Sequence, residues 1–263
     1  MRAADHPYFD LTGPVGLAHR GGALHTPNLQ RENTIPAFRE AVRLGFRYLE
    51  TDVHATADDV LVAFHDDVLD RVTDGSGPIA AASAADLRRV RTPAGDAIPT
   101  LVEVIEEFPD ANLNIDVKSV GAIAPLVETL RAMDVLDRVC VGSFSERRLR
   151  AVRSALGPRL ATALGQVGIV GARFAPGLLT RVVHSSAPVA QIPVRHLVRG
   201  RTVELVTPAL VDRLHTLGKH LHVWTIDDAE QMHRLLDLGV DGIVTDRPEV
   251  LLDVFAERGL GGP

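Results

Sequence analysis

The fold of this chain is decided by residues 48–65, which have the sequence YLETDVHATADDVLVAFH. Two runs of β-type residues, Tyr48–Val53 and Val60–Phe64, lie here on either side of the pair Asp58-Asp59. The gap between the runs is too short for a helical crossover, so they cannot be parallel neighbours in a sheet. A β-hairpin is therefore predicted, with its turn at the two aspartates.

Outside this hairpin, short β-type runs alternate with longer segments of helical period. Beside Tyr48–Val53, the predicted strands are 15–18, 113–117, 139–144, 160–164, 189–194, 221–225 and 242–245. The predicted helices are 34–44, 100–108, 122–133, 146–156, 207–217 and 227–238. If the second arm of the hairpin rises above the sheet, eight strands remain. The pattern predicts an α/β fold, a (β/α)8 TIM barrel ahead of a doubly wound sheet, in one domain spanning 1–263.

The composition argues against several classes of protein. The net charge is −6, from 28 basic and 34 acidic residues, and no block of lysine or arginine suggests a nucleic-acid surface. The single cysteine, Cys140, rules out a disulfide framework and a cysteine-based zinc site. No apolar run approaches the length of about 18 residues that a membrane-spanning helix needs, and residues 1–13 lack the apolar core of a signal peptide. We therefore expect a cytoplasmic protein without a stable membrane anchor and leave its oligomeric state open.

Carboxylates gather on two of the predicted strands. Glu50 and Asp52 are two residues apart on one strand, so both side chains point to the same face. Asp116 and Lys118 repeat this spacing at the end of another strand. Three carboxylates that converge inside a barrel would repel one another unless a cation joined them, and oxygen ligands of this kind suit Mg²⁺ or Ca²⁺. The alternative is an exposed polar face at Glu50 and Asp52, with an ordinary ion pair at Lys118.

Two histidines also follow predicted strands. His19 and Arg20 end the first strand, and His65 ends the second arm of the hairpin, where a turn centred on Asp58-Asp59 would place it opposite Asp52. An imidazole can transfer protons near neutral pH, and a guanidinium can hold a phosphate. The alternative interpretation is an ordinary loop histidine beside a solvated arginine, and a turn residue at His65.

Two further residues lie at strand ends. Trp224, the single tryptophan, either stacks on a ligand or fills the core or the rim. Asp246 is interpreted as a cap for the helix that begins near Pro248. Nearly all of these residues follow the carboxyl ends of strands, where a (β/α)8 barrel keeps its active site. The set predicts metal-assisted hydrolysis of an anionic ester, with one histidine as general base and the other as general acid.

In combination, these residues resemble the glycerophosphodiester phosphodiesterase family. The matching motifs, in the family's order, are His19-Arg20-Gly21, Glu32-Asn33-Thr34, Glu50-Thr51-Asp52, His65-Asp66, Thr73-Asp74-Gly75, Ile98-Pro99-Thr100-Leu101, Val223-Trp224-Thr225 and DGIVTDRP at residues 241–248. The resemblance implies a TIM barrel that uses a divalent metal to hydrolyse glycerophosphodiesters to glycerol 3-phosphate and an alcohol.

The resemblance implies that Glu50, Asp52 and Asp116 hold the metal. Where the family usually has Glu-x-Lys, this chain has Asp116-Val117-Lys118. An aspartate reaches about 1.5 Å less than a glutamate, so direct ligation and ligation through a water both stay open for Asp116. The preferred metal stays open as well.

The resemblance further implies that His19 and His65 are the acid–base pair, without indicating which is the acid. It assigns Arg20 to the phosphate, Lys118 to the phosphoryl group and Trp224 to the glycerol side of the pocket. Residues 67–97 resemble the family's small helical insertion over the barrel mouth, which either shapes the pocket or only packs. Residues 1–14 are expected to be an extension before the barrel.

Two alternatives remain beside a hydrolase of small glycerophosphodiesters. One is a lysophospholipase D or a related phospholipid-cleaving barrel, against which the chain offers no evident basic amphipathic helix or exposed aromatic cluster. The other is a non-enzymatic barrel that binds a phosphorylated ligand, against which the complete set of polar residues argues. The alcohol group of the substrate stays open.

Overall fold

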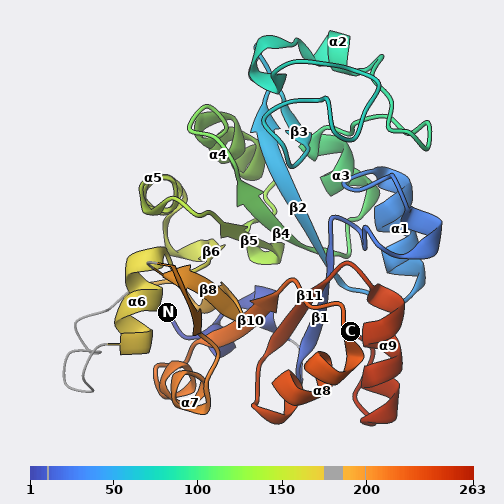
Figure 1. The fold of residues 1–263 in the computed structure, drawn as a ribbon. Coiled ribbons are helices and arrows are strands. Elements are labelled where there is room, and N and C mark those ends of the chain that lie inside the picture. Colours follow the sequence, from blue (N-terminus) through green and yellow to red (C-terminus); the bar gives the residue numbers. More distant parts are fainter. Residues whose placement is uncertain (11, 175–185, 199) are drawn as a thin grey trace.

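Eight parallel strands form a barrel that is surrounded by helices (Figure 1). The computed structural model describes residues 1–10, 12–174, 186–198 and 200–263, and every statement about the fold refers to these. In order round the sheet the strands are β6 (Ala161–Thr162), β5 (Val139–Gly142), β4 (Asn112–Val117), β2 (Tyr48–Ala55), β1 (Val15–His19), β11 (Gly242–Thr245), β10 (His220–Trp224) and β7 (Val189–Pro193). An isolated parallel bridge between Ala163 and Val189 joins the two end strands. The predicted α/β class and TIM barrel are confirmed.

Helices cover the outside of the barrel (Figure 1). They are α1 (Ile35–Arg43), α3 (Leu101–Glu107), α4 (Ile123–Ala132), α5 (Glu146–Leu156), α6 (Gln166–Phe174), α7 (Pro208–Thr216), α8 (Ala229–Asp237) and α9 (Pro248–Glu257). All six helices that the sequence predicts are present, and the helix expected near Pro248 is α9. Two elements were not predicted: α6, and a hairpin of β8 (Arg195–Val198) and β9 (Arg201–Glu204).

Local sequence fixes where most of these helices begin. The side chains of Thr34, Thr100, Ser145, Thr207 and Asp228 each accept a hydrogen bond from a backbone N–H of the first helical turn. The first N–H groups of a helix have no partner within the helix, so a side chain that accepts from them stabilises the start. These caps set the point at which the chain leaves the barrel mouth for the outer layer.

The strand β3 (Leu61–Ala63) pairs antiparallel with β2, so the predicted hairpin is confirmed. Its register differs from the prediction, because the Phe64 N–H donates to the carbonyl of Asp52. Phe64, and not His65, therefore lies opposite Asp52, and the predicted pairing is wrong by one residue.

The turn of this hairpin explains the difference. The loop closes where the Thr56 N–H donates to the Val60 carbonyl, and Asp59 adopts a left-handed conformation with φ 59°. The turn is thus centred on Asp58 alone rather than on the Asp58-Asp59 pair, which shifts every pairing by one position.

The amino-terminal turns η1 (Ala3–Asp5) and η2 (Pro7–Phe9) pack inside the barrel, against the beginnings of its strands. The buried cluster there consists of Ala3, Tyr8, Phe9, Val15, Leu17, Tyr48, Cys140, Ala161, Ala163, Val189 and Val244. Burial raises the pKa of the Cys140 thiol. This end of the barrel is filled by side chains, which leaves the opposite end for a site.

The segment 67–97 is a compact excursion after β3 that contains η4 (Ile79–Ala81) and α2 (Ala84–Leu87). A small hydrophobic core joins it to β3 and to the chain before α3: Leu69, Ile79 and Leu87 of the segment pack with Val62, Phe64 and Ile98. Further short turns are η3 (Thr26–Asn28), η5 (Leu136–Arg138) and η6 (Gly157–Arg159). Across the described ranges, no helix is both long and apolar enough to span a membrane.

Candidate active site

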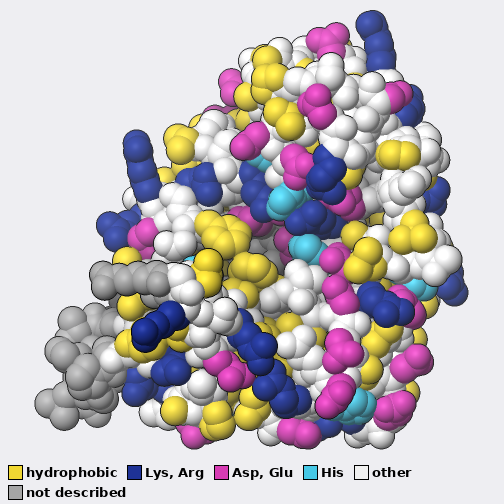
Figure 2. Space-filling view, in the orientation of Figure 1, with side chains coloured by type: hydrophobic (Ala, Val, Ile, Leu, Met, Phe, Trp, Pro, Cys, Tyr) yellow, Lys and Arg dark blue, Asp and Glu magenta, His cyan; other side chains and the backbone are white. Residues whose placement is uncertain are grey.

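A cavity of about 630 Å³ opens at the carboxyl ends of the barrel strands, and we call it the mouth cavity. All of the predicted site residues line it: His19, Arg20, Glu50, Asp52, His65, Asp116, Lys118 and Trp224. Figure 2 shows charged and histidine side chains gathered on one side of this hollow and hydrophobic side chains on the other. No residue of the 67–97 segment lines it, so its walls come from other elements.

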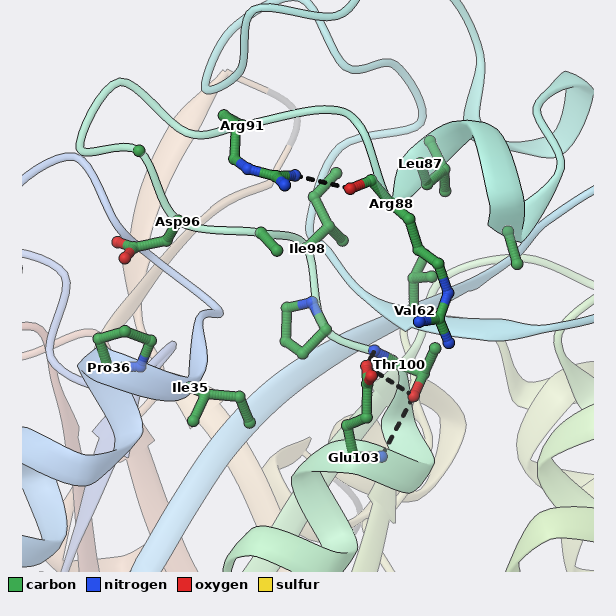
Figure 3. A pocket seen from close by; sticks show the side chains of 14 residues that line it. Ile35, Pro36, Val62, Leu87, Arg88, Arg91, Asp96, Ile98, Thr100 and Glu103 are labelled. Atoms are coloured by element: carbon green, nitrogen blue, oxygen red, sulfur yellow. Dashed lines mark hydrogen bonds between the residues drawn. The ribbon is translucent and has the colours of Figure 1, made fainter.

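A second cavity of about 500 Å³ lies between α1, the 67–97 segment and α3 (Figure 3). Thr100 caps α3, and the side chains of Thr100 and Glu103 each accept a hydrogen bond from the other's backbone N–H, while Arg91 donates to the carbonyl of Arg88. None of the predicted site residues lines it. The mouth cavity is therefore the candidate site.

The sheet register brings the polar side chains of the mouth cavity together in two layers. His19 pairs with Glu50 across β1 and β2, and Glu50 pairs with Asn114 across β2 and β4. One layer further along the strands, Asp52 pairs with Asp116. The prediction that Glu50 and Asp52 share one face, and that Asp116 joins them from another strand, is confirmed in placement.

The turn after His19 is shaped by packing. Arg20, Gly21 and Gly22 have φ values of 52°, 86° and 88°. A Cβ atom on Gly21 would lie 2.9 Å from the backbone of Ala37, and one on Gly22 would lie 2.7 Å from Pro248. These glycines allow close approach to α1 and α9, and the turn lets the Arg20 N–H donate to Glu50 Oε2 over 3.2 Å.

Cations surround Asp52 in the floor of the cavity. Lys118 Nζ lies 2.8 Å from Asp52 Oδ1 and 2.8 Å from Asp116 Oδ2, and Arg20 Nε lies 3.2 Å from Asp52 Oδ2. Burial acts to raise the pKa of Asp52, but the charges of Lys118 and Arg20 outweigh it and lower that pKa. Burial likewise opposes the charge of Lys118, yet Asp52 and Asp116 raise its pKa.

Glu50 is compensated less completely, since His19 and Arg20 act to lower its pKa but do not outweigh the effect of burial. Burial, followed by the charge of Asp52, raises its pKa to about 7. A buried carboxyl group whose pKa is raised in this way would gain from a further positive charge beside it. Asp116 shows a second deficit, because its Oδ1 is buried without a hydrogen-bond partner.

The raised pKa of Glu50 and the unpaired Oδ1 atom of Asp116 indicate whether these residues suit a divalent metal. Glu50, Asp52 and Asp116 offer only oxygen donors, which is the chemistry that Mg²⁺ and Ca²⁺ prefer. As the described side chains stand, no group of three or more His, Cys, Asp or Glu is arranged to hold a metal ion. The Lys118 ammonium lies between two of the three carboxylates. The donor set and its unsatisfied atoms suit a hard cation.

Each predicted catalytic histidine has a carboxylate partner on its Nδ1 atom. Asp246 Oδ1 lies 2.8 Å from His19 Nδ1, and Asp66 Oδ1 lies 2.5 Å from His65 Nδ1. Burial acts to lower the pKa of His19, but Glu50 and Asp246 outweigh it and raise that pKa. A carboxylate on Nδ1 fixes the ring and leaves Nε2 as the atom that can transfer a proton; in His19, Nε2 lies 3.8 Å from Glu50 Oε2.

Several residues that support the site were given no such role by the sequence prediction. Asn33 donates to Asp52 Oδ2 over 3.1 Å and accepts from the Thr51 hydroxyl. Arg71 bonds both Asp66 and Glu32, and Glu32 in turn bonds Arg20. The signal that could have identified Glu32 and Asn33 is the Glu32-Asn33-Thr34 motif. This motif was named only as part of the family resemblance, and its residues were given no role.

Asp246 corrects a sequence-based interpretation. It was expected to cap the last helix, but the cap of α9 is Arg247, whose side chain makes no capping hydrogen bond. Asp246 bonds His19 instead, and its N–H donates to Asp227 over 2.8 Å. A pairing between residues so far apart in the chain leaves no local signal in a single sequence.

Trp224 begins the apolar side of the mouth cavity. Its ring meets Phe144 edge to face, with centroids 5.6 Å apart and planes at 78°. Beyond it, α6 and the β8–β9 hairpin contribute Ile169, Val170, Phe174 and Leu197 to the lining. Two phenylalanines of the lining, Phe144 and Phe174, are 57% and 55% exposed, which the sequence did not indicate.

Comparisons with known proteins identify the family. The sequence profile of the Glycerophosphoryl diester phosphodiesterase family matches residues 19–250. The chain is 39% identical over 251 residues to Probable glycerophosphodiester phosphodiesterase 2 of Mycobacterium tuberculosis, with 94% of this chain and 92% of that protein covered. It is 27% identical over 269 residues to Lysophospholipase D GDPD1 of Homo sapiens, with 90% and 84% covered.

A solved structure is also similar. A phosphodiesterase of Oleispira antarctica, in complex with the product sn-glycerol-3-phosphate, has a TM-score of 0.75 and 25% identity, covering 93% of this chain and 97% of that one. Profile, relatives and structure agree along nearly the whole length of the barrel. The chain therefore belongs to the glycerophosphoryl diester phosphodiesterase family.

Proposed function

We propose that this protein hydrolyses glycerophosphodiesters to glycerol 3-phosphate and an alcohol. Its family and its 39% identical relative support this, as does the product bound to the Oleispira antarctica phosphodiesterase. The observation that carries the proposal is the pair His19 and His65, which line one cavity and each have a carboxylate on Nδ1.

Such a pair suits acid–base catalysis at a phosphodiester. One imidazole takes a proton from the attacking hydroxyl group or water through Nε2, and the other gives a proton to the oxygen of the leaving alcohol. Arg20 and Lys118 place positive charge where the phosphate binds, and Trp224 forms the wall beside the glycerol. Proton transfer at both oxygens lets the P–O bond break without releasing a free alkoxide.

The reaction would also use a divalent cation. Glu50, Asp52 and Asp116 are the residues that would hold it. When bound, Mg²⁺ or Ca²⁺ supplies charge that polarises the phosphoryl oxygens.

Replacing either histidine tests the acid–base pair. We expect His19→Ala and His65→Ala each to lower kcat on sn-glycero-3-phosphocholine by about 10²–10⁴-fold, because each removes one proton transfer. Release of glycerol 3-phosphate measures the rate, and circular dichroism checks the fold. His233→Ala, on the surface of α8, is the matched control. A double variant with wild-type turnover would end the proposal.

Metal removal tests the carboxylates independently of turnover. After treatment with EDTA, adding Mg²⁺, Ca²⁺ or Mn²⁺ at a hundred times its Kd should stabilise the fold by about 2.7 kcal/mol. For a domain of this size that corresponds to a rise in Tm of about 5–10 °C. Glu50→Gln should abolish the rise, whereas Glu107→Gln on exposed α3 should keep it. No rise with any of the three ions would contradict the metal site.

A further inference from the structure

One side of the mouth cavity is built from large apolar side chains that are mostly exposed. Phe144, Val170, Phe174 and Leu197 line it, with 57%, 58%, 55% and 65% of their surface accessible. We call these four residues the apolar wall. Single exposed hydrophobic residues are common on proteins, but a contiguous group around one cavity marks a binding surface.

Helix α6 shows that this exposure follows a pattern. Its residues in the lining are Gln166, Ile169, Val170, Arg173 and Phe174, a spacing that puts them on one face of a helix. A neighbouring stripe of the same helix packs on the barrel, where Ala172 is buried and Ile169 contacts the core. A helix that only covers a barrel needs one apolar stripe. The second stripe, at Val170 and Phe174, is turned to the cavity.

The apolar wall is continuous with the polar floor. Phe144 contacts Trp224 edge to face, and Trp224 lines the same cavity as Lys118 and His65. The cavity of about 630 Å³ reaches from the polar floor to the apolar wall, so a substrate whose phosphate lies on the floor extends toward the wall. The part of the substrate that reaches the apolar wall is either its alcohol or a group on its glycerol, and an uncharged alkyl or acyl chain suits exposed apolar side chains better than a charged choline.

We propose that the apolar wall is a subsite for an alkyl or acyl chain carried by the substrate, so that chain-bearing glycerophosphodiesters are preferred over glycerophosphocholine. This rests on the proposed phosphodiesterase function. The chain is attached either to the glycerol, as in a lysophospholipid, or to the alcohol that leaves. Both present the same chemistry to the apolar wall, and the substrates below distinguish them.

Three soluble substrates test the preference in the full-length protein: sn-glycero-3-phosphocholine, its 1-hexanoyl ester and sn-glycero-3-phosphohexanol. They are assayed below the concentration at which the ester forms micelles. Each methylene group that leaves water contributes a factor of about four, so kcat/KM should rise at least tenfold on one of the two chain-bearing substrates. The substrate that gains shows to which side of the phosphate the chain belongs.

Variants locate the effect. Val170→Ser combined with Leu197→Ser should lower the ratio of kcat/KM between the chain-bearing and chain-free substrates by about tenfold, since apolar contact area is lost. Val167→Ser is the matched control, because Val167 lies on the same helix, is 68% exposed and does not line the cavity. It should keep the wild-type ratio. Fluorescence of Trp224, next to Phe144, reports binding of the 1-hexanoyl ester to His19→Ala without turnover.

The outcomes separate this inference from the function beneath it. If glycerophosphocholine is hydrolysed and neither chain-bearing substrate has a higher kcat/KM than glycerophosphocholine, the subsite is refuted and the proposed phosphodiesterase activity stands. An equal loss in Val167→Ser also refutes it. So does a preference that arises only with phosphatidylcholine vesicles, which would make the apolar wall a membrane-docking surface. Absence of hydrolysis of all three substrates refutes the function and the subsite together.

Discussion

Asp246 holds the imidazole of His19 in place. Its carboxylate lies 2.8 Å from His19 Nδ1, and its own backbone N–H is held by Asp227. Without it, the imidazole could rotate or place its proton on Nε2, the atom that can transfer a proton. Such a residue positions the catalytic group and touches no substrate itself.

We therefore expect Asp246→Asn to lower kcat on the order of 10²-fold with little change in KM, because the proton transfer suffers and the phosphate contacts remain. Steady-state kinetics on glycerophosphocholine measure both constants. Asp67→Asn is the control, because this carboxylate is 89% exposed and does not line the cavity. If kcat stays at the wild-type value, the Asp246–His19 pair has no part in catalysis.

The site residues could be predicted because the carboxyl ends of the parallel strands lie together at one end of the barrel. Glu50, Asp52 and Asp116 have a spacing of two on parallel strands, and parallel strands end at one rim. The partners of the histidines were not assigned. Asp246 lies 227 positions from His19, and Asp66 belongs to a pair that an ordinary turn explains equally well.

Among the elements, the end of α3 is joined to the barrel by an arginine in addition to its apolar packing. Arg138, at the end of η5, donates to the carbonyls of Ile105, Phe108 and Ala111 over 2.8 to 3.1 Å. The carbonyls of the last helical turn have no partner within the helix, so the guanidinium supplies one for Ile105. This contact joins the end of α3 to the strand that follows η5.

Arg138→Ala should cost about 2–3 kcal/mol of the free energy of unfolding, because it removes hydrogen bonds from a charged donor to half-buried carbonyls. Urea denaturation followed by circular dichroism measures it. Arg150→Ala on α5, whose side chain is 73% exposed, should cost less than about 1 kcal/mol. A loss at position 138 as small as that at 150 would show that α3 is held by apolar packing alone.

Elements with one apolar stripe were predicted, and the element with two was not. The helices predicted for α1 and α8 begin at capping residues and show a clear apolar face, and the structure has both. Helix α6 has the sequence QVGIVGARF, in which two glycines and apolar residues on both faces hide the helical period. The β8–β9 hairpin was not predicted either, because its described side chains are largely exposed and so give no alternation of apolar and polar residues.

On the scale of the whole molecule, the barrel interior holds a histidine that resists protonation. His222 is fully buried, and within the described structure neither of its ring nitrogens has a hydrogen-bond partner. Burial, aided by the nearby His220, lowers its pKa to about 3. In the unfolded chain the pKa of this histidine is about 6.5, so between these two values the unfolded chain binds a proton at His222 and the folded chain does not.

The stability of the fold should therefore fall as pH decreases from about 6.5 toward about 3. His222 alone contributes a slope of up to roughly 1.4 kcal/mol per pH unit in this window and none above it. His222→Leu should flatten the dependence, which unfolding in urea at pH 7, 6 and 5 measures. His233→Leu on the surface should keep the wild-type slope. Equal slopes for all three proteins would mean that water or a neighbouring group satisfies His222.

The overall architecture was predictable for a reason that differs from the site. Alternation of strands and helices over the whole chain, with one gap too short for a crossover, leaves few topologies. What the pattern could not supply is the exact turn, and so His65 was placed opposite Asp52 one residue out of register. A shift of one residue in a hairpin depends on a single left-handed backbone conformation at Asp59, to which periodicity is insensitive.

The buried thiol has a practical use. Cys140 is the single cysteine of the chain, it is fully enclosed by the barrel, and its raised pKa keeps it from forming the thiolate that reacts with maleimides. The folded protein should accordingly be inert to such reagents without any engineering. A cysteine introduced at Val167 would then be the one reactive thiol. A dye coupled to it would report on ligand binding beside α6 from a single, known position.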